Sequence, residues 1–133
     1  DSELLSEYVQ SDPSLLIGDL PTGRVIFFWN THCGACHMAW DFLDEFLPNH
    51  PEIEVLDYDL FNIDNRTLFE NYKNKYHRSS LYIPSMIVGN LTFEGSQDIR
   101  NHLPEILELQ QNYKTQKSFL SDILNFFKNL GLI

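Results

Sequence analysis

The two cysteines of the chain, Cys33 and Cys36, are separated by two residues and stand at the start of a stretch with helical periodicity. Backbone N–H groups in a first helical turn have no intrahelical acceptor, and the helix dipole is positive there. Both effects favour a thiolate and lower the pKa of a cysteine below the value of about 8.5 for a free thiol. The spacing therefore predicts an exposed nucleophile at Cys33, which attacks a disulfide, and a buried thiol at Cys36, which resolves the mixed disulfide.

A run of β-branched and aromatic residues, 24–29, comes shortly before the cysteines. It predicts a strand that is apolar on both faces, which is typical of a central strand in a sheet covered by helices. From Cys33 to Leu47 the apolar residues recur at the helical period, and Pro48 and Pro51 end this helix. The cysteine pair is thus expected where a central strand leads into a helix.

The remaining elements are expected in a simple order along the chain. They are a helix over 2–10, a short strand over 15–17, a strand over 53–59, a helix capped by Asp64 or Asn65 that runs to about Tyr76, a loop at 79–80, a hairpin over 85–88 and 91–94, a helix from 96 to about 110, and an amphipathic helix over 115–130. Leu68, Phe69, Tyr72 and Tyr76 form the expected inner side of the third helix.

This order predicts an α/β fold in which a central mixed sheet is flanked by helices on both faces. We expect one domain over residues 1–133, with a core over about 14–110 and a C-terminal helical extension over about 114–130. Docking of that extension on the domain is the expected arrangement, because its large apolar side chains would otherwise face water. Pairing with a partner, or a membrane tether beyond Ile133, is the alternative.

Composition excludes several classes of function. The 133 residues include 9 basic and 19 acidic side chains, a formal net charge of −10, so phosphate backbones would repel the chain and no nucleic-acid partner is expected. No apolar run approaches the roughly 18 residues that span a bilayer. Because the first residue is Asp1, the chain is expected to lack an N-terminal segment of its gene product. Asn65 and Asn90 begin N-x-T patterns, which favour a secreted or membrane-tethered protein over a cytoplasmic one.

A second chemical feature is the Ile83–Pro84 pair just before the expected hairpin. A proline at the start of a strand, after an exposed loop, is a candidate for a cis peptide bond. If this pair lies opposite Cys33, its neighbouring backbone groups are able to bind an extended substrate as an added strand.

Taken together, these residues resemble the thioredoxin superfamily over about residues 14–110. The matching segments are 25–29, 33–39, 42–46, the Ile83–Pro84 pair and 93–95. The resemblance implies a thioredoxin fold, a cis Pro84 beside the active site and thiol–disulfide exchange. General thioredoxins often carry a buried aspartate at the position of Phe27 in this chain. They have a proline at the position of Ala35, and many have a helix-kinking proline at the position of Asp41. These departures indicate a specialised member.

Several residues near the cysteines have two interpretations. A protonated His32 or His37 would stabilise the Cys33 thiolate, whereas the simpler interpretation is two solvated histidines. Trp29 is expected to pack at the core or rim of the site first and to contact substrate second. Asp57 or Asp59 is a candidate replacement for the missing proton acceptor, although a solvated strand end is the simpler interpretation.

Three other functions of the cysteine pair compete with redox exchange. The pair would also serve as a structural disulfide. Residues 33–37 match the C-x-x-C-H pattern of haem attachment, with Met38 or Met86 as an axial ligand. Cys33 and Cys36 with His32 and His37 would supply four donors to a metal ion. The strand–helix junction favours a redox pair over a structural disulfide. The preceding apolar strand and the Ile83–Pro84 pair favour it over haem attachment, and the adjacent histidines would strain a metal site.

The sequence thus predicts a thiol–disulfide oxidoreductase that acts on protein dithiols or disulfides, with neither metal nor cofactor. Cys33 and Cys36 are the predicted catalytic residues. Ile83, Pro84 and Trp29 are the predicted substrate-binding residues. The alternative is a non-catalytic thioredoxin-fold module that docks a partner protein.

Overall fold

The computed structural model describes residues 2–76 and 81–132, and the loop expected at 79–80 lies outside this part. The described residues form a four-stranded sheet in the order β2-β1-β3-β4. β1 (Arg24–Trp29) pairs in parallel with β2 (Glu54–Asp59) and antiparallel with β3 (Ser85–Val88), and β3 forms a hairpin with β4 (Leu91–Glu94). The predicted α/β class with a mixed sheet is confirmed.

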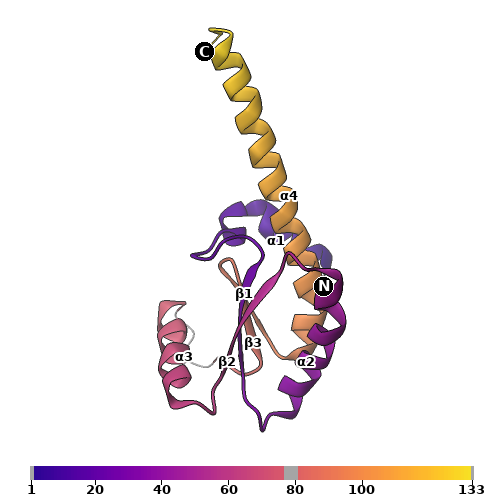
Figure 1. Cartoon of the computed structure of the whole chain (residues 1–133), viewed down its shortest axis with the longest axis vertical. Coiled ribbons are helices and arrows are strands. Elements are labelled where there is room, and N and C mark those ends of the chain that lie inside the picture. Colours follow the sequence, from indigo (N-terminus) through magenta and orange to yellow (C-terminus); the bar gives the residue numbers. More distant parts are fainter. Residues whose placement is uncertain (1, 77–80, 133) are drawn as a thin grey trace.

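Helices cover both faces of the sheet (Figure 1). α2 (Gly34–Phe46) and the first part of α4 (Ser96–Asn129) pack on one face, and α3 (Ile63–Lys75) packs on the other. Val25 and Phe27 of β1 join the cluster of α2 and α4, whereas Ile26 and Phe28 pack against α3. Because successive side chains of a strand point to opposite faces, β1 contributes core residues to the clusters on both faces of the sheet.

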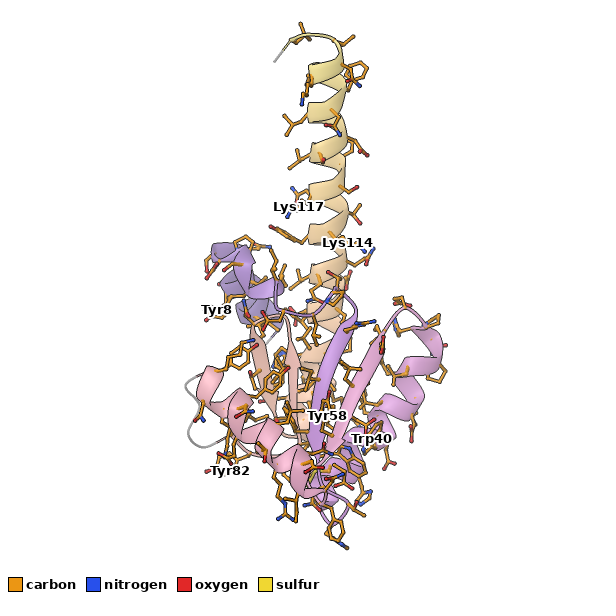
Figure 2. The ribbon with its side chains drawn as sticks, turned by 60° about the vertical axis from the view of Figure 1, so that its left-hand side comes forward. Tyr8, Trp40, Tyr58, Tyr82, Lys114 and Lys117 are labelled. Carbon is orange, nitrogen blue, oxygen red and sulfur yellow. A yellow bond between two sulfur atoms is a disulfide. The ribbon has the colours of Figure 1, made fainter. Side chains whose placement is uncertain are left out.

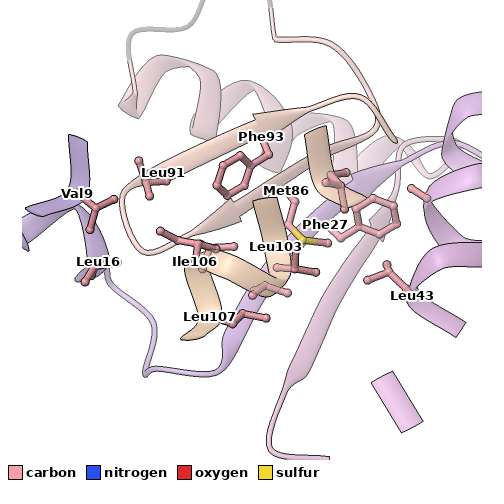
Figure 3. Close-up of a cluster of buried hydrophobic side chains, with 14 residues drawn as sticks. Val9, Leu16, Phe27, Leu43, Met86, Leu91, Phe93, Leu103, Ile106 and Leu107 are labelled. Carbon is pink, nitrogen blue, oxygen red and sulfur yellow. The ribbon is translucent and has the colours of Figure 1, made fainter. Parts of the chain in front are cut away.

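The larger cluster lies between the sheet and α2, α4 and α1 (Ser2–Ser11) (Figure 3). Phe27 is fully buried there, and its ring meets Trp40 edge to face with centroids 5.1 Å apart. On the α3 face, Phe28 lies 4.8 Å from Phe69 and 5.5 Å from Tyr72, centroid to centroid. Burial raises the pKa of the Tyr72 hydroxyl above its ordinary value. The predicted inner side of α3 is therefore confirmed.

The strand predicted over 15–17 is wrong. A 3₁₀ helix, η1 (Pro13–Leu16), occupies this region, and the side chain of Asp12 caps it by accepting a hydrogen bond from the Ser14 N–H at 3.3 Å. Proline has the backbone angle of a first helical position and lacks the N–H that would be unpaired there. The Asp12–Pro13 pair therefore begins a helical turn although the residues after it favour a strand.

The predicted cap of the third helix is also wrong. Asn62, not Asp64 or Asn65, caps α3, because its side chain accepts from the Asp64 N–H at 2.9 Å. The Asn65 amide instead donates to the Asp59 carbonyl at 3.0 Å. Three polar residues that favour caps lie within four positions, and only the tertiary position of the preceding strand decides among them.

The two helices expected after residue 96 are one continuous helix of 34 residues, α4. Residues 111–115 contain neither glycine nor proline, so nothing interrupts the backbone hydrogen bonds between the two apolar patterns. The expectation that the last part docks on the domain is wrong as well. Residues 114–130, which we call the tail helix, project beyond the sheet and leave most of their large apolar side chains exposed (Figure 1).

Candidate functional site

Cys33 and Cys36 form a disulfide where β1 leads into α2, with their Cα atoms 5.2 Å apart. Cys33 is the N-cap of α2, and its sulfur accepts a hydrogen bond from the Cys36 N–H at 3.1 Å. Cys33 is partly exposed, whereas Cys36 is fully buried. The expected placement of the pair is confirmed, and an N–H donor already points at the sulfur that would carry the thiolate charge.

A tight turn before α2 aims Cys33. The Cys33 N–H donates to the Asn30 carbonyl at 3.1 Å, and the His32 N–H donates to the Asn30 side-chain oxygen at 2.9 Å. An asparagine that binds its own backbone two residues on is a common way to set a turn. Asn30 is a positioning residue that the sequence interpretation missed, although an asparagine directly after a strand was a signal for it.

Asp59, the last residue of β2, holds the same turn from the neighbouring strand. Its carboxylate accepts from the Thr31 hydroxyl at 2.6 Å, from the Thr31 N–H at 3.3 Å and from the Phe61 N–H at 3.0 Å. The hydrogen bond from the Thr31 hydroxyl, followed by that from Phe61, lowers the pKa of Asp59 below its ordinary value. These bonds place Asp59 against the loop that presents Cys33, and its role as proton acceptor for Cys36 remains a prediction.

Trp29 lies at the end of β1, partly buried against the larger core cluster. Its indole N–H donates to the Asp57 carboxylate at 3.1 Å, and its ring meets Trp40 edge to face at 5.5 Å. The expected packing role of Trp29 is confirmed, and its contact with substrate remains a prediction. Asp57, the second candidate proton acceptor, orients the indole of Trp29.

His32 and His37 are both exposed and flank the disulfide. The His37 Nε2 atom lies 2.6 Å from the Thr31 carbonyl, which only accepts, so Nε2 carries a proton and donates. The His32 ring lies edge to face with Phe61, centroids 5.5 Å apart. His37 thus ties the start of α2 to the turn before Cys33. The effect of either ring on the thiolate remains a prediction.

The alternatives of metal binding and haem attachment gain no support from this geometry. Over residues 2–76 and 81–132, no three or more His, Cys, Asp or Glu side chains are grouped so as to hold a metal ion. Met86 is fully buried in the core and pairs with Phe27 across the sheet, while Met38 is exposed on α2.

The Ile83–Pro84 peptide bond is cis, as predicted. Pro84 directly precedes Ser85, which pairs with Phe28, so it lies at the end of the sheet where β1 leads toward Cys33. Pro84 is fully buried and its carbonyl accepts from the Gly95 N–H at 2.7 Å, whereas Ile83 is partly buried. The sheet therefore brings the two chemical features of the sequence to one end.

The chain matches no protein-family model, no curated protein and no solved structure. What the site does must therefore be inferred from its own geometry.

Proposed function

We propose that this protein is a thiol–disulfide oxidoreductase of the thioredoxin type that exchanges disulfides with protein partners. The observation that carries the proposal is the Cys33–Cys36 disulfide at the amino end of α2, with the first cysteine partly exposed and the second buried. A buried second sulfur is protected from outside thiols, so it reacts mainly with the mixed disulfide at its neighbour.

The order of the elements supports the same interpretation. A parallel β1–α2–β2 unit is followed by α3, an antiparallel β3–β4 hairpin and α4, with the cis Pro84 at the start of the hairpin. This is the arrangement that the resemblance to thioredoxins implies for residues 14–110. We propose that Ile83 and Pro84 bind an extended segment of the partner beside Cys33, and that Trp29 forms the rim of that site.

The proposed reaction transfers one electron pair in two exchange steps. In the reduced protein, the Cys33 thiolate attacks one sulfur of the partner disulfide, and the other partner sulfur leaves as a thiolate. Cys36 then loses its proton and attacks the Cys33 sulfur, which releases the second partner sulfur. The partner ends as a dithiol and the protein as the disulfide form, with the reverse sequence oxidising a partner dithiol.

Insulin reduction with dithiothreitol tests this proposal. We expect the 133-residue chain to accelerate the reaction, Cys33→Ser to abolish the acceleration, and Cys36→Ser to accumulate a mixed disulfide with the substrate. Met38→Ala is the matched control, because Met38 is exposed on the same helix two residues beyond Cys36. A rate that is the same with and without Cys33 would instead support a binding module.

The direction of electron flow follows from the equilibrium of the pair with glutathione. Reduction potentials of proteins with this chemistry range from about −270 mV for reductants to about −120 mV for oxidants, set by how strongly the thiolate is stabilised. If a protonated His37 stabilises the thiolate, His37→Ala lowers the potential, and His32→Ala is the comparison on the other side of the pair.

A further inference from the structure

The tail helix, which comprises the last part of α4 and its C-cap residue Leu130, is amphipathic, although the described part of the chain does not cover it (Figure 2). Phe119 is 63% exposed, Leu124 57% and Phe126 60%. At 3.6 residues per turn, seven apolar side chains fall within an arc of about 160°, namely Phe119, Leu120, Ile123, Leu124, Phe126, Phe127 and Leu130. Within the described residues, no helix is long and apolar enough to cross a membrane.

The apolar face of the tail helix is not a continuation of the face that α4 packs on the sheet. Ile99, Leu103 and Ile106 are fully buried and define that packed face. The centre of the tail's apolar arc is rotated from it by about a third of a turn. The arc instead continues the outer side of the first part of α4, where Asp98 and Asn101 are exposed. This chain's own domain therefore lies on the wrong side to cover it.

Charge distinguishes the tail helix from the rest of the molecule. It carries Lys114, Lys117 and Lys128 against a single acid, Asp122, whereas residues 1–113 carry 18 acidic and 6 basic side chains. On the helical wheel, Lys117 and Lys128 lie at one margin of the apolar arc, where long side chains extend their charged ends to a polar boundary.

We propose that the tail helix binds the surface of a membrane that contains anionic lipids. The broad apolar arc with three phenylalanines would enter the boundary between headgroups and acyl chains, and the marginal lysines would bind lipid phosphates. A second copy of the chain offers a poorer fit. Helical pairs are usually joined by opposite charges beside their seam, and the tail supplies three lysines with only one acid.

Binding through the tail helix would also set the orientation of the domain on the membrane. Lys114 lines a cavity of about 690 Å³ together with Thr22 and Gly23, which precede β1, whereas Cys33 follows the far end of β1. The tail helix thus leaves the domain at the end opposite the disulfide. On a bilayer, the acidic domain would stay in water with Cys33 directed away from the lipid. This inference does not depend on the proposed redox activity.

Flotation of the 133-residue chain with lipid vesicles tests the proposal. We expect binding to phosphatidylcholine vesicles that contain phosphatidylglycerol, and weaker binding to phosphatidylcholine alone. Phe119→Gln and Phe126→Gln should each weaken binding about tenfold on both vesicles. Lys117→Gln and Lys128→Gln should each weaken binding about fivefold on the anionic vesicles only.

Ser118→Gln is the matched control, because residue 118 lies on the polar side of the same helix and should leave binding unchanged. Thermal unfolding checks that each variant keeps its fold, which exposed positions should allow. Failure to float with either vesicle overturns the proposal. A monomer–dimer equilibrium, measured by sedimentation without lipid and lost in Phe119→Gln, would overturn it in favour of a second copy.

Discussion

The carboxylate of Asp59 binds both the hydroxyl and the backbone N–H of Thr31, with oxygen–oxygen and oxygen–nitrogen distances of 2.6 and 3.3 Å. Thr31 stands two residues before Cys33, so the end of β2 holds the loop that presents the exposed sulfur. His37 reaches the carbonyl of the same threonine from α2 at 2.6 Å. One residue of the loop thus links the neighbouring strand to the helix that carries the disulfide.

The Asp59 contact predicts a dependence of stability on pH. The pKa of Asp59 is lower in the folded chain than its ordinary value of 3.8. Its ionised form therefore stabilises the fold above the ordinary value, and this contribution is lost as the pH falls through the folded pKa. We expect the free energy of unfolding to fall more between about pH 5 and about pH 2 in the native chain than in Asp59→Asn.

Urea unfolding across that pH range measures this difference, since other carboxyl groups contribute equally to both proteins. Thr31→Ala should shift the profile in the same direction but less than Asp59→Asn does, because the N–H groups of residues 31 and 61 still donate to Asp59. Thr31→Ser, which keeps the hydroxyl, should retain the native profile. Parallel curves for the native chain and Asp59→Asn would contradict the assignment.

The two thiols of the reduced protein should differ in reactivity. Cys33 is partly exposed and its sulfur accepts an N–H, whereas Cys36 is fully buried. We therefore expect iodoacetamide to modify Cys33 of the reduced, folded protein first, as measured by mass spectrometry of its peptides, and to modify both cysteines equally in urea. Preferential modification of Cys36 would reverse the proposed roles of attacking and resolving thiol.

The β3–β4 turn packs against the start of the chain with no room for a side chain. A Cβ atom on Gly18 would lie 2.5 Å from the Gly89 carbonyl oxygen, and one on Gly89, which has φ +59°, would lie 2.7 Å from the Leu15 carbonyl oxygen. We expect Gly18→Ala and Gly89→Ala to destabilise the fold by about 1–3 kcal/mol each in urea unfolding.

Gly34 is the control for these two substitutions. Its Cβ position is open and it lies in the first turn of α2, so Gly34→Ala should be neutral or should stabilise by up to about 1 kcal/mol. A loss of stability at Gly34 equal to that at Gly18 would contradict the steric explanation.

Substitution of two phenylalanines should distinguish the packed core from the exposed tail helix. Phe27 is fully buried against Trp40, and Phe119 is 63% exposed on the tail helix. We expect Phe27→Ala to cost about 3–5 kcal/mol of unfolding free energy in the absence of lipid and Phe119→Ala to cost less than about 0.5 kcal/mol. A comparable loss at both positions would mean that the tail helix packs against something in solution.

The sequence by itself determined the central strand, the helix after it and the cysteine pair at their junction. The hydrophobic pattern of a short segment is a local property: residues 24–29 form a continuous apolar run, and apolar residues over 33–47 recur at the helical period. The cis bond at Pro84 was predictable for the same reason, because only proline makes this geometry accessible.

Only the tertiary structure decided which polar side chains serve the site. The bonds between Thr31 and Asp59 join a turn to a neighbouring strand, so they depend on the parallel register of β1 with β2, whereas the Asn30 turn is local. The exposure of the tail helix was likewise not determined by its local sequence. Its apolar stripe predicts burial, but whether the domain covers it depends on the rotation of a continuous helix, which accumulates over many residues.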